Sequence, residues 1–283
     1  MSPDFDNVGA RNGSAATPRA LVIGGARRVG RAICIALAER GCEVWLTYNS
    51  SGEEAAGVVE ELRGKSRGLI DAAGRSAAIP AAPAHRAFRV VLDDPDAARA
   101  AVTNELRGTD RLDVLVLCAS VYSPSPFAAL DGARVRHDFS VNAASPALIA
   151  AACAALLAKS ALASGGAIVT MCDLHALGEA GRPRSGYAAY SMSKAALLEL
   201  TLVLARELAP QRTRVNAVAP GVVAFPEAGR ESAPAAQTAY VARVPLGRAG
   251  TPEEAAAAVV WLALDAGYCT GQVIKVDGGR GIV

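Results

Sequence analysis

The sequence of 283 residues lacks several features that mark specialised classes of protein. Its six cysteines include no C-x-x-C pair, which argues against a disulfide framework and against a zinc site. Lysine is scarce, with four among 29 Lys and Arg residues, and no basic cluster concentrates the net charge of +2. Neither nucleic acid nor an anionic membrane is therefore indicated as a partner. The longest apolar run, residues 146–158, is too short to span a bilayer.

The amino terminus also lacks an apolar signal core. Residues 1–19 are polar and rich in Gly, Pro and Ser, and we expect them to form a disordered tail. Most cysteines stand in apolar runs, where a free thiol behaves as a small buried hydrophobe. A reducing compartment suits such a chain, so the sequence predicts a cytoplasmic protein.

What is present is a regular alternation of short apolar strands with helices. Hydrophobic residues make up 52% of the chain and charged residues 20%, which is typical of a compact globular protein. Strands are predicted at 20–24, 43–48, 88–92, 112–118, 166–172, 214–219 and 271–279, and helices at 30–41, 51–64, 95–107, 132–159, 188–209 and 251–264. This alternation predicts an α/β fold: one doubly wound parallel sheet of about seven strands, with helices on both faces.

Two irregular segments interrupt this pattern. Residues 64–87 form a long connection before the third strand, and residues 221–250 follow the sixth strand with little periodicity. Ligands of doubly wound sheets bind beyond the carboxyl ends of the strands. We therefore predict one domain over residues 20–283, with a substrate lid at about 221–250.

A glycine-rich turn joins the first strand to the first helix. Gly24, Gly25 and Gly30 in "GGARRVGR" would let the backbone approach a diphosphate, and the following helix offers free N–H groups. A plain tight turn is the alternative interpretation. The position of the glycines between the first strand and the first helix favours nucleotide binding.

The end of the second strand favours NADP(H) over NAD(H). An acidic residue there would bind the ribose 2′-hydroxyl and repel a 2′-phosphate. This chain instead offers Asn49, Ser50 and Ser51, with Arg27 and Arg28 in the neighbouring glycine turn. Neutral donors and guanidinium groups suit a phosphate.

Tyr190 and Lys194 lie four residues apart in a predicted helix, which places both side chains on one face. A nearby ammonium favours the phenolate and would lower the pKa of the tyrosine towards the working pH. Tyr190 would then be a usable general acid. A tyrosine beside a solvated lysine on a helix surface is the alternative, which the pair alone does not exclude.

From Ala20 to Gly279 the chain resembles the short-chain dehydrogenase/reductase family. The resemblance rests on the glycine turn, "LDVLVLCAS" (112–120), "SVNAASP" (140–146), "YSMSK" (190–194), "RVNAVAPG" (214–221), "PLGRAGTPEE" (245–254) and "YCTGQVIKVDGG" (268–279). It implies a single Rossmann-like domain with catalytic Tyr190, with Lys194 on the nicotinamide ribose and with Asn142 supporting a proton relay. Pro220 and Gly221 would line the nicotinamide. Val29, Asp93 and Ala119 are further cofactor contacts that the resemblance implies. A homotetramer, formed through helices 132–159 and 188–209 and the C-terminal strand, is also implied.

At three positions the chain departs from the general family pattern, and at these positions it resembles the pteridine reductases. Arg28 replaces the middle glycine of the turn, Ala119-Ser120 follows the fourth strand, and Asp173 stands after the fifth strand where the family has serine. The resemblance implies that Arg28 and Ser120 contact cofactor and substrate and that Tyr122 stacks on a pterin ring. An ordinary loop aromatic is the alternative for Tyr122. Asp173 precedes Tyr190 by seventeen residues, which indicates a short insertion near the pocket.

These residues predict an NADPH-dependent reductase of a flat, donor-rich heterocycle such as a dihydropterin or dihydrofolate. A carboxylate such as Asp173 can accept hydrogen bonds from such a ring, whereas a simple ketone offers it no donor. The alternatives are reduction of a ketone, quinone or 3-oxoacyl thioester, and a cofactor-binding protein with little turnover. Cys172, Asp173 and His175 form too small a cluster for a metal site. His85 and His137 are predicted to be surface residues.

Overall fold

The structure is a computed structural model that describes residues 16–67, 83–177, 184–225 and 232–282. Seven parallel strands form one sheet in the order β3-β2-β1-β4-β5-β6-β7. The strands are β1 (Arg19–Ile23), β2 (Glu43–Tyr48), β3 (Arg86–Arg89), β4 (Val114–Leu117), β5 (Gly166–Met171), β6 (Thr213–Pro220) and β7 (Val273–Val276). The strand order reverses between β1 and β4, so the predicted doubly wound, Rossmann-like sheet is confirmed.

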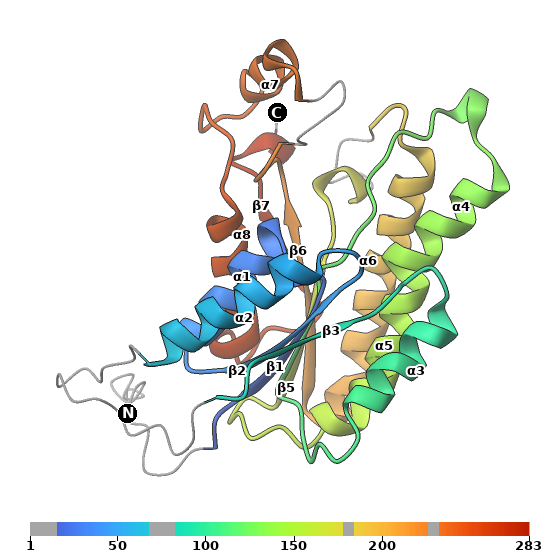
Figure 1. The fold of residues 1–283 in the computed structure, drawn as a ribbon. Helices are drawn as coiled ribbons and strands as arrows, with labels where there is room; N and C mark the ends of the chain where they lie inside the picture. The colour runs from blue at the N-terminus through green and yellow to red at the C-terminus, as the bar shows by residue number, and fades with distance from the viewer. Residues whose placement is uncertain (1–15, 68–82, 178–183, 226–231, 283) are drawn as a thin grey trace, which may run out of the picture.

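Helices cover both faces of the sheet (Figure 1). One layer contains α1 (Arg28–Glu39), α2 (Gly52–Arg67) and α8 (Pro252–Val260), and the other contains α3 (Pro95–Glu105), α4 (Gly132–Phe139), α5 (Ser145–Leu157) and α6 (Ala188–Leu208). The short helix α7 (Pro234–Val241) lies beyond the sheet, near the C-terminus of the chain. It belongs to the segment that the sequence predicts to be a lid.

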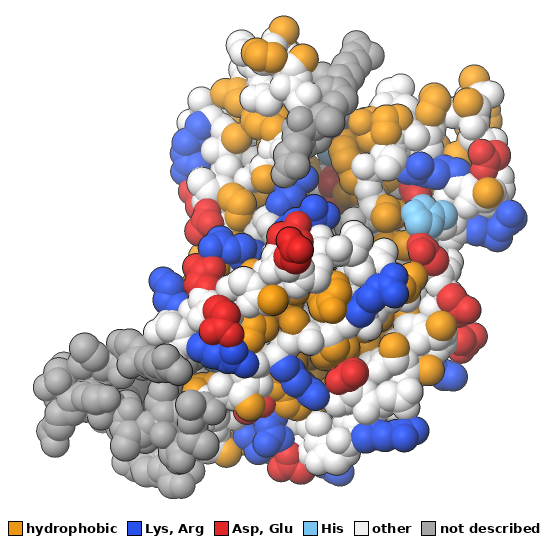
Figure 2. Space-filling model, viewed as in Figure 1, with side chains coloured by type: hydrophobic (Ala, Val, Ile, Leu, Met, Phe, Trp, Pro, Cys, Tyr) orange, Lys and Arg blue, Asp and Glu red, His pale blue; other side chains and the backbone are white. Residues whose placement is uncertain are grey.

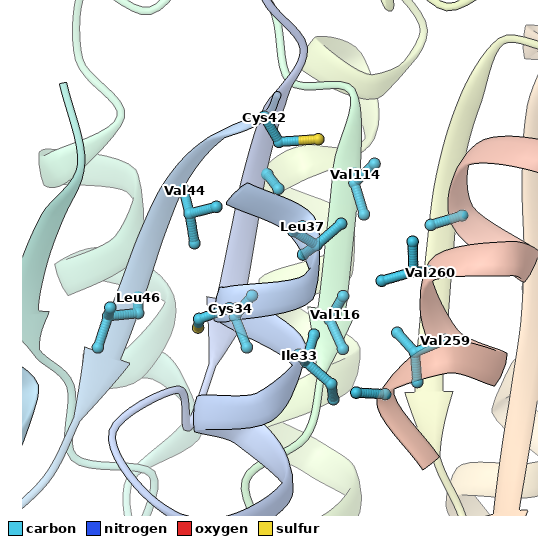
Figure 3. Close-up of a cluster of buried hydrophobic side chains, with 14 of the residues drawn as sticks. Ile33, Cys34, Leu37, Cys42, Val44, Leu46, Val114, Val116, Val259 and Val260 are labelled. Carbon is cyan, nitrogen blue, oxygen red and sulfur yellow. The ribbon is translucent and has the colours of Figure 1, made fainter. Parts of the chain in front are cut away.

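The central strands β1, β4 and β5 are mainly apolar and almost wholly buried because each face of the sheet packs against helices. In β1, Ala20 and Val22 belong to the core beneath α1, whereas Leu21 and Ile23 belong to the core on the opposite face. This alternation follows the two-residue period of a strand. Figure 3 shows the first core, where Ile33, Cys34 and Leu37 of α1 meet Val114 and Val116 of β4 and Val259 and Val260 of α8.

Several boundaries differ from the sequence prediction. The expected helix 132–159 is two helices, α4 and α5, joined by one turn of π-helix at Ser140–Ala144. The first strand begins at Arg19 rather than at residue 20, and most of the predicted tail, residues 1–15, lies outside the described residues. The prediction that His85 lies at the surface is wrong. His85 is 3% exposed, and its Nδ1 accepts a hydrogen bond from the backbone N–H of Val44.

Two stretches, Gly132–Leu157 and Ala188–Gln211, are long and apolar enough to cross a bilayer by length and composition alone. Both lie along the sheet and carry buried polar side chains, including Asp138, Asn142 and Lys194. In this structure they are helices that pack on the core of the domain. On the face shown in Figure 2, basic and acidic side chains are interspersed over α1 and α2.

Candidate active site

A cavity of about 440 Å³ opens where β1, β4, β5 and β6 end. It brings together eight of the residues predicted to form the site: Arg28, Ser120, Tyr122, Asp173, Tyr190, Lys194, Pro220 and Gly221. Val29 lines it as well. Asn49, Ser50, Ser51 and Asp93 do not line this cavity and follow β2 and β3 instead. This arrangement puts the predicted reactive groups in one compartment and leaves Asn49, Ser50 and Ser51, the predicted 2′-phosphate contacts, outside it.

The glycine turn has the geometry of a nucleotide cradle. Gly24 has φ +85°, and a Cβ there would lie 2.7 Å from the Ala119 backbone. A Cβ on Gly30 would lie 1.9 Å from the Gly24 carbonyl oxygen. Helix α1 begins at Arg28 with no side-chain cap and no acidic residue in its first turn. Its first N–H groups are therefore available to an anion, and the turn fits the diphosphate of a dinucleotide.

The two arginines of the turn point to different partners. Arg28 has a left-handed φ of 52°, the conformation that glycine adopts most easily. Its guanidinium donates to the carbonyl oxygens of Ala224 at 2.7 Å and Phe225 at 3.0 Å, in the segment after β6. Arg27 instead lies 3.8 Å from Glu54 in the first turn of α2. Arg27 therefore lies beside the first turn of α2, the helix that follows the predicted 2′-phosphate contacts, and Arg28 contacts the segment after β6.

The accessible polar groups after β2 are fewer than the sequence suggested. Asn49 and Ser50 are exposed, whereas Ser51 is 8% exposed. Asp93 lies after β3, where its carboxylate is 3.0 Å from Nδ1 of His137. His137 is exposed, as predicted.

Asn142 ties the loop after β4 to helix α6. It lies in the π-helical turn and is fully buried. Its Oδ1 accepts hydrogen bonds from the Ser120 hydroxyl at 3.0 Å and from the Val121 N–H at 2.9 Å. Its Nδ2 donates to the Val121 carbonyl and to Ser193 Oγ. Asn142 thus fixes Ser120 at the cavity edge.

Tyr190 and Asp173 form the central polar pair. The Tyr190 hydroxyl donates a 2.6 Å hydrogen bond to Asp173 Oδ2, while Asp173 Oδ1 accepts from the His175 N–H. Burial, followed by the charge of Asp173, raises the pKa of Tyr190 well above its usual value. The sequence-based expectation of a lowered pKa is wrong here, because the closest charge is an acceptor for the phenolic proton.

Lys194 lies one helical turn beyond Tyr190 and is 2% exposed. Its ammonium donates a 2.8 Å hydrogen bond to the Met171 carbonyl oxygen at the end of β5. Burial lowers the pKa of Lys194. An ammonium carries three donors, so the bond to Met171 fixes its position at the cavity wall and leaves capacity for a further acceptor.

An aromatic cluster forms one wall of the cavity. The Tyr122 ring stacks on Tyr187 with centroids 4.6 Å apart and contacts Tyr190 edge-on at 4.8 Å. The Arg184 guanidinium lies 5.0 Å from the centre of the Tyr187 ring and 5.7 Å from that of Tyr122. One face of Tyr122 is therefore covered by Tyr187.

Sequence reasoning missed Ser125, which holds this cluster in place. Ser125 is 3% exposed and pairs with the segment before α6. Its N–H donates to Gly186, its carbonyl accepts from Ala188, and its hydroxyl accepts from the N–H of Ala189 at 3.0 Å. Ser125 thus caps α6 from a segment 64 residues away. No local pattern in the sequence marks such a cap.

Tyr240 of α7 was also missed. It is 7% exposed, and its hydroxyl accepts a hydrogen bond from the Val222 N–H at 3.1 Å. Its ring lies edge-on to Phe225. The segment after β6 is therefore held by Tyr240 on one side and by Arg28 on the other.

The described part of the chain contains no group of three or more metal-ligating side chains. All six cysteines are free thiols. Cys118 and Cys172 line the cavity, and burial raises the pKa of Cys118 to about 11. These thiols are therefore neutral apolar groups at physiological pH.

The Rossmann-like sheet and the cavity at the carboxyl ends of its strands indicate an oxidoreductase of the dinucleotide-binding type. Comparison with known proteins agrees. The family described as enoyl-(acyl carrier protein) reductase matches residues 24–280. An uncharacterized oxidoreductase of Methylorubrum extorquens is 35% identical over 92% of this chain and 96% of its own length. A 3-oxoacyl-[acyl-carrier-protein] reductase of Synechocystis is 32% identical over 92% of this chain and 95% of its own.

A solved structure gives the same result. The crystal structure of an acetoin dehydrogenase from Salmonella typhimurium superposes with a TM-score of 0.77 at 26% sequence identity, covering 94% of this chain and 97% of the other. The chain belongs to the short-chain dehydrogenase/reductase family. It is therefore an oxidoreductase of the kind that uses a nicotinamide cofactor, as the sequence predicted.

Proposed function

We propose that this protein is an NADP(H)-dependent reductase in which Tyr190 donates the proton. The single observation that carries the proposal is the buried 2.6 Å hydrogen bond between Tyr190 and Asp173 at the reacting end of the cavity. NADP(H) is favoured over NAD(H) because Asn49 and Ser50 are exposed after β2 and Arg27 lies near them.

The chemistry divides between the cofactor and the side chains. NADPH, when bound, supplies the hydride. Tyr190 has a raised pKa, so its hydroxyl is protonated at neutral pH and can act as the acid. Lys194 stands at the cavity wall as a donor for the ribose hydroxyls. Ser120, held by Asn142, offers a hydroxyl at the edge of the substrate.

The substrate we propose is a pteridine, such as a dihydropterin or dihydrofolate. Asp173 lines the cavity and carries acceptor capacity beyond its bonds to Tyr190 and His175. A ring with amino and amide-like N–H groups supplies matching donors. A simple ketone supplies none, and desolvating the carboxylate without such donors costs free energy. We propose that Tyr122, which lines the cavity, stacks on this ring.

A second candidate is reduction of a 3-oxoacyl thioester or another ketone. The observation that favours it is the similarity over nearly the whole chain to 3-oxoacyl-[acyl-carrier-protein] reductases. In this case Tyr190 would protonate a carbonyl oxygen instead of a ring nitrogen, and Asp173 would act only on Tyr190.

The test is an NADPH-oxidation assay with dihydropterin, dihydrofolate, a quinone and a 3-oxoacyl thioester side by side. Turnover of either pteridine at a kcat/KM at least tenfold above that of the thioester would support the proposal. Turnover of the thioester or quinone with none of either pteridine would reject it and leave the second candidate. NADPH binding without turnover of any substrate would indicate a cofactor-binding protein.

We further propose that the protein is a cytoplasmic homotetramer. Oligomers are typical of the family. Helix α6 exposes Leu202 and Val203, at 40% and 42%, on the helix expected to form an interface. Sedimentation velocity on the full chain measures the assembly, and a monomer at micromolar concentration would contradict it.

A further inference from the structure

A second cavity of about 510 Å³ lies next to the active-site cavity. The two share Arg184, Val222 and Tyr240 in their linings. The active-site cavity must hold the nicotinamide end of the cofactor as well as the reacting group of the substrate. Any extended part of a substrate therefore needs room elsewhere, and the second cavity is the compartment beside it.

The walls of the second cavity come from three parts of the chain. Pro124 and Pro126 follow β4, Tyr187 precedes α6, and Phe225 follows β6. Rings and prolines present rigid apolar surfaces that suit an aromatic or aliphatic arm. Ser125 lies between the two prolines and is bonded to Gly186 and Ala189, so these walls are fixed relative to the catalytic helix.

Two guanidinium groups, Arg184 and Arg243, complete the lining, and no acidic residue of the described chain lines this cavity. Arg243 is exposed and donates from Nε to the Ala239 carbonyl. It makes no ion pair with the described residues. Its remaining donors form the planar fork that binds a carboxylate. The cavity therefore combines apolar walls with positive charge.

We propose that this cavity is a subsite for an apolar or aromatic substrate arm that ends in a carboxylate, with Arg243 as its anchor. The inference rests on the proposed reductase function and adds a specificity determinant to it. Arg243 does not touch the reacting atoms. It contributes to the binding of substrates that carry such an arm and leaves the chemical step unchanged.

The kinetic test compares two substrates that share the same reacting ring. Dihydrofolate has a carboxylate-bearing arm, and dihydropterin has none. In Arg243→Gln, we expect KM for dihydrofolate to rise about tenfold, with kcat unchanged and KM for dihydropterin within about twofold. Arg206→Gln, an exposed change on α6 outside both cavities, is the matched control. Equal changes in both KM values would overturn the subsite.

A binding test separates this proposal from the choice of substrate. 4-Acetamidobenzoate and its uncharged amide are titrated into the NADP⁺-loaded protein by ligand-observed NMR. Tighter binding of the carboxylate, lost in Arg243→Gln and kept in Arg206→Gln, supports the subsite even if neither pteridine is reduced. Equal binding of acid and amide, or the same affinity in both variants, contradicts it.

Discussion

The hydroxyl of Tyr190 donates a 2.6 Å hydrogen bond to Asp173, although the two residues are seventeen positions apart in the chain. Asp173 follows β5 and accepts the N–H of His175, while Tyr190 stands in the first turn of α6. The strand end and the helix start therefore meet at one carboxylate. This bond keeps the phenol protonated and fixes its direction at the cavity wall.

Removing the Tyr190 hydroxyl tests its role as the acid. Tyr190→Phe keeps the ring that packs edge-on against Tyr122 and removes the proton. We expect kcat to fall by roughly 10²–10⁴-fold with the Kd of NADPH changed by less than about threefold. Stopped-flow turnover and a fluorescence titration measure the two. More than a tenth of wild-type turnover, where chemistry limits the rate, would remove Tyr190 from this role.

The charge of Asp173 should appear in the pH profile. The carboxylate raises the pKa of Tyr190, so its removal in Asp173→Asn lowers that pKa. An acid must be protonated to act, so activity is lost as pH rises through its pKa. We expect the alkaline limb of kcat/KM to lie at lower pH in the variant than in the wild type. Identical alkaline limbs, with both proteins stable over this range, would show that Tyr190 is not the titrating acid.

The fold could be predicted because each strand and each helix is indicated by a pattern within its own short stretch of sequence. The central strands are short apolar runs that are buried on both faces by helices with their own spacing. The break between α4 and α5 was not predictable in this way. Its π-helical turn is stabilised by tertiary hydrogen bonds of Asn142 to the loop after β4 and to Ser193. The hydrophobic periodicity of the sequence gives no sign of such bonds.

The candidate site was predictable in its reacting residues but not in their contacts. The glycine turn, Tyr190 and Lys194 show characteristic spacings, and the structure gathers them at one sheet edge. The partner of Tyr190 was misjudged. The spacing of four residues along a helix predicts that Lys194 lies near Tyr190. The hydrogen bond from Tyr190 to Asp173 instead depends on where β5 ends, which spacing does not show. The contact of Arg28 with the segment after β6 was not predicted either, because it joins residues that lie far apart in the chain.

Cofactor preference should depend on Arg27. We expect NADPH to bind at least about tenfold more tightly than NADH, a difference of about 1.4 kcal/mol. Arg27→Ala should reduce this ratio by weakening NADPH alone, because its guanidinium lies 3.8 Å from Glu54 in the first turn of α2, the helix that follows the exposed Asn49 and Ser50. Arg31→Ala is the control, since Arg31 pairs with Glu61 further along the helices. Equal wild-type affinities for both cofactors in a fluorescence titration would overturn the preference.

Ser125 should act on catalysis through the position of Tyr190. Its hydroxyl accepts the Ala189 N–H, so Ser125→Ala leaves a buried donor unpaired at the start of α6. We expect a loss of stability of about 1–2 kcal/mol and a kcat reduced by about tenfold, with the Kd of NADPH unchanged. Thr keeps the hydroxyl, so Ser125→Thr should restore most of kcat.

The matched control is Ser191→Ala in α6, because Ser191 Oγ has no partner among the described residues. Denaturant unfolding and steady-state kinetics measure both effects. If Ser125→Ala lost stability but kept wild-type kcat, the cap would support the helix without positioning the tyrosine.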